Sequence, residues 1–172
     1  TGFTAQNTYL YLIGCIYMAE SSMHMIQWFA EDIGEEAQLI GNFFDFIKNY
    51  ELLVNYNGSG FDIPYLKKKC EMLQLNHPFD NIKNLDLYRM IAPIKKIFNL
   101  KNFRQKSIEE FLNVKREDKL DGGDLIAIYQ SYLGKKQIEK LRKTRNIQTA
   151  ENNTSCESEK LLHLLLQHNE DD

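Results

Sequence analysis

The acidic residue best placed for chemistry is Asp62, because it follows directly on a turn-forming segment. A short apolar run passes into Asn57-Gly58-Ser59-Gly60-Phe61 and then, at Asp62, into helical spacing. α/β proteins place much of their chemistry where a strand gives way to a helix. Taken alone, Asp62 has a plainer interpretation as a carboxylate that caps the helix, and the local sequence favours that interpretation.

A second candidate acid, Asp172, comes at the end of the last helical stretch. The preceding residues at i, i+3, i+4 and i+7 predict a buried stripe, made of Leu161, Leu164, Leu165 and His168. Asp172 lies one further i+4 step along this stripe. Each residue again has a plainer interpretation, His168 as a histidine that complements the helix dipole and Asp172 as a charged residue at a frayed terminus.

The three residues together indicate a divalent metal ion. A buried carboxylate is costly unless it is paired or bound to a cation, and a second acid at Asp62 adds to that cost. Clustered oxygen ligands with a histidine nearby suit Mg²⁺ or Mn²⁺, which hold phosphates and activate water. We therefore expect Asp62, His168 and Asp172 to belong to one metal-dependent site.

The elements that must position these residues alternate between strands and helices. Strand patterns occupy residues 8–19, 22–30, 52–56 and 82–87, the first two as a hairpin. Helical spacing covers residues 35–50, 62–75, 88–98, a segment from the capping box at Ser107, a segment from Leu125 that stops at Gly134, and 159–169. Residues 144–158 are polar and predict a loop. This order predicts an α/β sheet domain.

Composition predicts one globular domain over residues 1–172. With 43% apolar residues the chain can bury a substantial core. No apolar run approaches membrane-spanning length, which predicts no membrane contact and a cytoplasmic protein. Cys15, Cys70 and Cys156 show no metal-ligand spacing and leave an odd thiol over, so a disulfide framework is not expected and a reducing compartment fits.

The formal net charge of −3 is unevenly distributed along the chain. Residues 61–145 carry nineteen Lys and Arg against eleven Asp and Glu, whereas both flanking segments are acidic. A basic middle can mark a surface that contacts phosphates, although it is more often a set of solvated helix faces. The candidate phosphate contacts are Lys67, Lys68, Lys69, Arg104, Lys106, Lys115 and Arg116.

The motifs, in this order, resemble those of the DnaQ-like, or DEDD, 3'-5' exonuclease superfamily. NYNGSGFDIPYL is similar to its second motif, N-x-x-x-F-D, and most similar to the YprB-like branch of RNase H-fold domains. NLDLYRM resembles the strand and helix that come next in that branch, and SIEEFLNVKREDKLDGGDLIAIYQSYL its later helical segment. LLQHNEDD resembles the third motif, H-N-x-x-D. The resemblance covers most of residues 1–172.

The resemblance implies an RNase H-like mixed sheet flanked by helices and a phosphodiester hydrolase that uses two Mg²⁺ or Mn²⁺ ions. Asp62 and Asp172 would then be metal ligands, and His168 would orient or deprotonate the attacking water. The residues against the terminal nucleotide would include Asn57, Gly58 and Phe61.

The sequence departs from the superfamily at its beginning. Members start with a strand that ends in D-x-E-T, whose two carboxylates are half of the metal site, and Thr1-Gly2-Phe3 looks like the residues that follow that motif. We expect a first strand, apparently absent from this chain, in the native protein, because a sheet without its central strand would expose an apolar edge. The chain as given is expected to be nearly inactive.

Three classes of function are compatible with these residues. The leading one is an enzyme, a metal-dependent 3'-5' exonuclease acting on single-stranded or 3'-end DNA or RNA. A nucleic-acid-binding module without catalysis would keep the basic segment and need none of the acids. A structural RNase H-fold adaptor would need neither. A helicase or repair partner fits such a module, but no residue specifies one, and endonucleolytic cleavage stays open beside exonucleolytic cleavage.

Overall fold

A computed structural model describes residues 5–6, 8–98, 100–117, 120, 122–144 and 151–172. The chain divides into two compact units, and each is described by itself. Unit 1 comprises Thr1–Leu10 and Ile33–Lys115, and unit 2 comprises Tyr11–Asp32 and Arg116–Asp172. The single domain over residues 1–172 stays a prediction.

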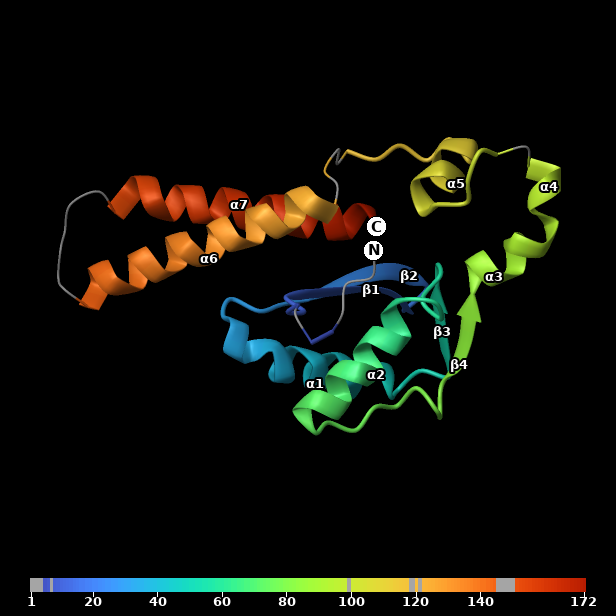
Figure 1. Cartoon of the computed structure of the whole chain (residues 1–172), viewed down its shortest axis with the longest axis horizontal. Helices are drawn as coiled ribbons and strands as arrows, with labels where there is room; N and C mark the ends of the chain where they lie inside the picture. Colours follow the sequence, from blue (N-terminus) through green and yellow to red (C-terminus); the bar gives the residue numbers. More distant parts are fainter. Residues whose placement is uncertain (1–4, 7, 99, 118–119, 121, 145–150) are drawn as a thin grey trace. The chain divides into compact units, whose positions relative to one another are not determined.

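Unit 1 is built around a parallel strand pair with helices before, between and after its strands (Figure 1). The strands are β3 (Leu52–Asn55) and β4 (Lys83–Asp86), with Asn55 opposite Asp86. The helices are α1 (Glu36–Ile47), α2 (Asp62–Leu73), α3 (Leu87–Ile91), α4 (Lys95–Phe98) and α5 (Gln105–Phe111), with short 3-10 turns η1 (Ile33–Glu35) and η2 (Ala92–Ile94). Pro93 lies within η2, which separates α3 from α4.

Unit 2 combines an antiparallel hairpin with two long helices that run side by side (Figure 1). The hairpin strands are β1 (Leu12–Ala19) and β2 (Ser22–Phe29), and the helices are α6 (Gly122–Thr144) and α7 (Glu151–Asp171). The turn residues Glu20 and Ser21 have positive φ angles of 49° and 65°. Positive φ at both central residues is what a type I′ hairpin turn requires.

A buried ion pair organises unit 1. Lys69 Nζ lies 2.8 Å from Glu36 Oε1, and the two side chains are only 3% and 8% exposed. The Lys69 ammonium also donates to the Thr8 carbonyl, and the Glu36 carboxylate accepts the Leu10 N–H at 2.7 Å. Buried charges are tolerated only when they are paired and hydrogen-bonded, as here. The pair thus joins α1, α2 and the segment 8–10. The apolar face of α1 supplies the buried core of this unit.

Aromatic rings form the core of unit 2. Tyr129 of α6 stacks on Tyr11 with ring centroids 4.0 Å apart, and its hydroxyl donates to the Ala30 carbonyl at 3.1 Å. Phe29 packs edge-on against Tyr129, and Leu165 of α7 is 1% exposed in the same cluster. The hairpin, α6 and α7 therefore share one core.

The predicted α/β architecture and the four predicted strands are confirmed, with the parallel and antiparallel pairs as two separate two-stranded sheets. The stripe on residues 35–50 is confirmed, since Leu39, Ile40, Phe43, Phe44 and Ile47 are buried. None of the described helices is long and apolar enough to cross a membrane. Cys15 and Cys70 are free thiols, and the side chain of Cys156 lies outside the described residues.

Four helix predictions are wrong in their boundaries, the first over residues 88–98, which form α3, η2 and α4 in place of one helix. Gly134 does not end a helix, because α6 continues through it to Thr144. A helical glycine costs only about 1 kcal/mol, and beyond it α6 still contacts α7, since Glu139 Oε1 accepts the Ser158 hydroxyl at 2.7 Å. Residues 151–158, predicted as loop, belong to α7, and residues 145–150 lie outside the described part. Near this end of α7 the Ser158 hydroxyl donates to Glu139 of α6, a contact that apolar spacing does not predict.

The capping box at Ser107 does not start a helix either. α5 begins at Gln105 with Arg104 as its N-cap residue. Asn102 Oδ1 accepts both the Arg104 N–H, at 3.0 Å, and the Ser107 hydroxyl, at 2.8 Å. Ser107 therefore donates its hydroxyl to Asn102 and does not cap the helix, and the N-cap residue Arg104 makes no side-chain capping bond.

We expect Lys69→Met to lower the free energy of unfolding by about 3–5 kcal/mol, because it leaves the buried Glu36 carboxylate without its cation. The matched control is Lys68→Met, which removes an exposed pair with Glu71 and should leave the free energy of unfolding close to that of the parent. Urea denaturation of both variants measures the difference. Equal losses of unfolding free energy in the two variants would show that the buried pair contributes no more to stability than the exposed pair.

Candidate functional site

The segment that resembles the second motif leaves the carboxyl end of β3 as a tight loop, here called the Asn57 loop (residues 57–61). Asn57 adopts a left-handed φ of 61°, and its carbonyl accepts the N–H groups of Gly60, at 2.9 Å, and Phe61, at 3.2 Å. Asparagine tolerates this conformation better than most residues. The loop reverses the chain and delivers it to α2.

The two glycines of the loop are required by close approach to side chains. A Cβ atom on Gly58 would lie 2.5 Å from Asn55 Oδ1, and one on Gly60 would lie 2.6 Å from Asn57 Oδ1. Neither glycine has a positive φ. Gly58 N–H donates to Asn55 Oδ1 at 2.9 Å, so the same closeness forms a hydrogen bond.

Asp86, at the carboxyl end of β4, holds the Asn57 loop. Its Oδ1 accepts the Asn57 N–H at 2.9 Å and its Oδ2 accepts the Ser59 N–H at 3.1 Å. It is also the N-cap residue of α3, accepting the Arg89 N–H at 3.4 Å. The sequence placed Asp86 only within the strand pattern of residues 82–87. The signal that could have identified it as a site residue is its position at the carboxyl end of a strand, where α/β proteins place functional residues.

The Asp86 carboxylate is stabilised in its charged form. Burial, which leaves the residue 5% exposed, would by itself raise its pKa. The hydrogen bonds from Asn57, Ser59 and Arg89 outweigh burial and lower the pKa below the usual aspartate value. The loop is therefore held by an anion at neutral pH.

Asp62 is the first residue of α2 and is exposed. The N-cap position belongs to Phe61, which has no side-chain capping bond, so the interpretation of Asp62 as the capping residue is wrong. A carboxylate in the first turn still complements the helix dipole. Phe61 is 46% exposed and its ring stacks on Tyr65 with centroids 6.3 Å apart. The loop thus presents a carboxylate and an aromatic ring next to each other.

At the end of α7, His168 and Asp172 form a pair on one helix face. His168 Nε2 lies 3.2 Å from Asp172 Oδ2, and the guanidinium of Arg116 contacts Asp172 Oδ1. The Asp172 N–H donates to the His168 carbonyl at 3.1 Å, which continues the helical hydrogen-bond pattern. Asp172 is therefore held by its neighbours within unit 2. His168 is buried as predicted, whereas Leu164 of the predicted stripe is 39% exposed.

Asn169, between His168 and Asp172, anchors this end of α7 to the hairpin. Gln27 Nε2 donates to Asn169 Oδ1 and to the Leu166 carbonyl, each at 2.9 Å. Gly14, the register partner of Gln27, leaves room for the amide, since a Cβ there would lie 2.1 Å from Asn169 Oδ1. Sequence reasoning missed this contact, because its partners are far apart in the chain.

The basic candidates are dispersed. Lys69 is wrong as a phosphate contact, because its ammonium is buried against Glu36. Lys67 and Lys68 lie in exposed ion pairs with Asp80 and Glu71. Arg104 is exposed at the start of α5, and Arg116 is the residue that contacts Asp172.

The predicted site residues fall into two groups. Unit 1 contains the Asn57 loop, Asp62 and Arg104, and unit 2 contains Arg116, His168 and Asp172. Carboxylate oxygens suit Mg²⁺ and Mn²⁺. The number of grouped donors is too small for a metal site, because among the described residues no three His, Cys, Asp or Glu side chains are grouped to hold a metal. These residues are therefore candidate ligands and do not by themselves complete a metal site.

We expect Asp86→Asn to lower the free energy of unfolding by about 1–3 kcal/mol, because an amide cannot accept both loop N–H groups. The lowered pKa of Asp86 means that its contribution is present at neutral pH and declines as pH falls from about 5 through the folded-state pKa. Urea titrations at pH 7 and pH 3 should therefore show a smaller difference between parent and variant at pH 3. A constant difference would contradict the assigned charge.

Gly14→Ala should lower the free energy of unfolding by about 1–3 kcal/mol, because the added methyl overlaps the Asn169 amide that Gln27 holds. Gly134→Ala is the control within the same unit. No atom lies within 4 Å of a Cβ at Gly134, so it should stabilise α6 by about 0.5–1 kcal/mol. Thermal unfolding measures both, and a neutral Gly14→Ala would disprove the anchor.

Comparison with known proteins agrees with the strand–loop–helix geometry. The RNase_H superfamily matches residues 1–172. A DNA polymerase of Thermococcus aggregans is 22% identical over 149 residues, 71% of this chain and 8% of the relative. DNA polymerases of Thermococcus litoralis and Thermococcus kodakarensis are 21% identical over 149 residues and 32% identical over 68 residues, covering 71% and 35% of this chain and 9% and 4% of the relatives.

The chain spans less than a tenth of the length of these relatives. The match of the superfamily, in contrast, extends over the whole chain and includes both the Asn57 loop and the end of α7. An α/β fold with a parallel pair and an antiparallel hairpin is consistent with it. The chain belongs to the RNase H superfamily.

Proposed function

We propose that this chain is the catalytic module of a metal-dependent 3'-5' exonuclease of the DnaQ-like, YprB-like type. Membership of the RNase H superfamily supports hydrolysis of a nucleic-acid backbone. The observation that carries the proposal is the Asn57 loop, which Asp86 fixes at the carboxyl end of β3 and which leads directly into Asp62. Parallel-strand carboxyl ends are where open α/β sheets bind ligands.

In this proposal Asp62 and Asp172 are metal ligands, completed by the two carboxylates of the D-x-E strand that the resemblance implies. Two Mg²⁺ or Mn²⁺ ions would supply charge stabilisation for the attacking and leaving oxygens. His168 orients the attacking water or accepts its proton, and its Nε2 is held in place by Asp172. Asn57, Gly58 and Phe61 contact the terminal nucleotide, with the exposed Phe61 ring offering a face to a base.

The two arginines have different support as nucleic-acid contacts. Arg104 is exposed and adjoins further basic residues, as a phosphate contact requires. The side chain of Arg116 is 11% exposed, and its guanidinium contacts Asp172. In the structure it therefore neutralises the charge of that carboxylate. Contact of Arg116 with nucleic acid and the cytoplasmic location both stay predictions.

A second candidate is a nucleic-acid-binding module without catalysis. One observation favours it: both oxygens of Asp172 already have partners, Arg116 on one and His168 on the other. A carboxylate so occupied can serve structure alone. The two candidates differ in whether Asp172 is needed for cleavage or only for folding.

The nuclease assay uses a longer form of the protein that carries the D-x-E strand implied by the resemblance, with a 5'-labelled single strand of DNA or RNA. We expect Mg²⁺- or Mn²⁺-dependent shortening from the 3' end, abolished by Asp172→Asn. His168→Ala should slow cleavage about 10²- to 10⁴-fold and leave metal binding largely intact, because histidine serves the water. The chain as given should be nearly inactive, since it supplies too few ligands to fix two ions.

Asp171→Asn is the matched control, since it removes the neighbouring carboxylate of the same helix and should leave cleavage close to that of the parent. Thermal unfolding of each variant separates lost chemistry from lost folding. If the longer form binds metal and strand yet leaves the label at full length with every metal tried, the exonuclease fails and the binding module replaces it.

A further inference from the structure

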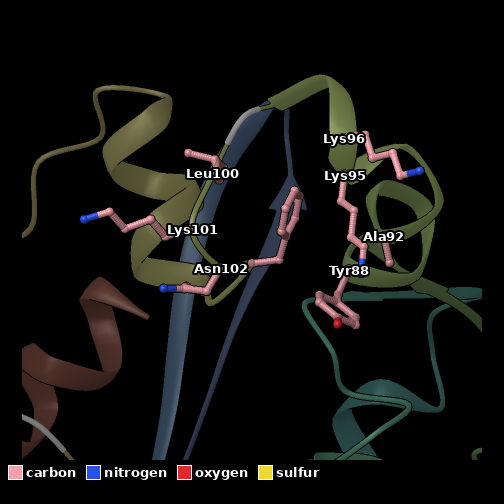
Figure 2. Close-up of a pocket in the computed structure, with 8 residues that line it drawn as sticks. Tyr88, Ala92, Lys95, Lys96, Leu100, Lys101 and Asn102 are labelled. Atoms are coloured by element: carbon pink, nitrogen blue, oxygen red, sulfur yellow. The ribbon is translucent and has the colours of Figure 1, made fainter.

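A pocket of about 490 Å³ opens in unit 1 beyond the carboxyl end of β4. Its walls combine two aromatic rings with basic and amide side chains (Figure 2). The residues that matter for its chemistry are Tyr88, Lys95, Lys96, Lys101, Asn102 and Phe103. None of them belongs to the candidate site described above.

The charged residues that line this pocket are all lysines. Residues 87–108 contain no Asp or Glu, and their basic residues are Arg89, Lys95, Lys96, Lys101, Arg104 and Lys106. Among the described residues no carboxylate forms an ion pair with the three lysines that line the pocket. Clustered uncompensated lysines attract phosphate groups.

The side chains of the three lysines that line the pocket point in different directions. In Figure 2 the side chain of Lys95 extends along the pocket toward Tyr88, whereas those of Lys96 and Lys101 extend outward on opposite sides. Lys95 is therefore placed to contact a group inside the pocket, and the other two to attract a polyanion that passes over its rim.

The aromatic walls are fixed by contacts behind them. Tyr56 packs edge-on against Tyr88 with centroids 5.8 Å apart, and its hydroxyl donates to the Phe103 carbonyl at 2.7 Å. Phe98 packs edge-on against Phe103 at 5.9 Å. Rings held in this way form a stable apolar wall, which a free inorganic phosphate does not need but a nucleobase does.

Tyr56 connects the pocket wall to the Asn57 loop through its contacts with Tyr88 and the Phe103 carbonyl. Tyr56 immediately precedes the Asn57 loop, and Tyr88 follows Asp86 by two residues. Both tyrosines thus lie just past the carboxyl ends of the two parallel strands, the edge at which α/β sheets bind ligands.

We propose that this pocket holds one nucleotide of a single-stranded nucleic acid, with its phosphate on Lys95 and its base against the rings of Tyr88 and Phe103. The proposal rests on the proposed function and deepens it. It gives the strand a second anchoring point, distinct from the terminal nucleotide that the Asn57 loop contacts.

Fluorescence anisotropy of a labelled single strand, with EDTA present, tests the pocket independently of catalysis. Lys95→Ala in the full chain should weaken binding severalfold and reduce the slope of log affinity against log salt by about 0.7, the value for one single-strand phosphate contact. Lys48→Ala is the matched control, since Lys48 is an exposed lysine of unit 1 paired with Asp45 and lies outside the pocket. It should leave both quantities unchanged.

A second measurement tests the base contact. Phe103→Leu keeps an apolar side chain but removes the ring, and should weaken binding of the intact strand about fivefold or more. Binding of an abasic strand of equal length should not change. Equal weakening for both strands would reduce the site to a phosphate contact and overturn the base-binding assignment.

The outcomes separate the two proposals. If the strand binds the parent and Lys95→Ala with equal affinity and salt dependence, the pocket assignment fails and the proposed function stands. If the parent binds no single strand even at low salt, the proposed function itself fails.

Discussion

The buried carboxylate of Asp86 is the interaction on which the geometry of the candidate site depends. A single side chain accepts N–H groups from Asn57, Ser59 and Arg89, and so ties β4, the Asn57 loop and α3 together. Because unpaired buried N–H groups are costly, the loop has one arrangement that satisfies them. Everything that the loop presents, including Asp62, takes its direction from that arrangement.

Unit 2 uses the same principle with an amide in place of a carboxylate. Gln27 reaches from the hairpin to Asn169 and to the backbone of α7, and Gly14 provides the space for that contact. His168 and Asp172, on either side of Asn169 along the helix, are thereby set in register with the hairpin. In both units a part-buried polar contact fixes the segment that carries the candidate residues, Asp86 with the Asn57 loop and Gln27 with Asn169.

The aromatic and basic residues beyond β4 extend this organisation toward a strand of nucleic acid. Tyr56 links the Asn57 loop to the pocket wall through Tyr88 and the Phe103 carbonyl. A nuclease of the RNase H superfamily must hold a flexible polyanion in one position before any bond is broken, and positioning of this kind contributes a large share of catalysis. In the proposal above, the ring of Tyr88 and the ammonium of Lys95 would serve that need.

The sequence by itself determined the local elements. The strand patterns, the apolar face of α1 and the Asn57-Gly58 turn were predicted correctly, because each depends on residues close together in the chain. The candidate chemistry of Asp62, His168 and Asp172 also came from local spacing and motif resemblance. Tertiary structure decided the rest. Asp86 meets Asn57 across 29 residues and Gln27 meets Asn169 across 142, separations at which no local pattern identifies partners. α6 likewise continues through Gly134 and α7 begins at residue 151, because a helical glycine or a polar stretch is only a weak local signal to stop, and contacts between the two helices, such as that of Ser158 with Glu139, are not visible in local spacing.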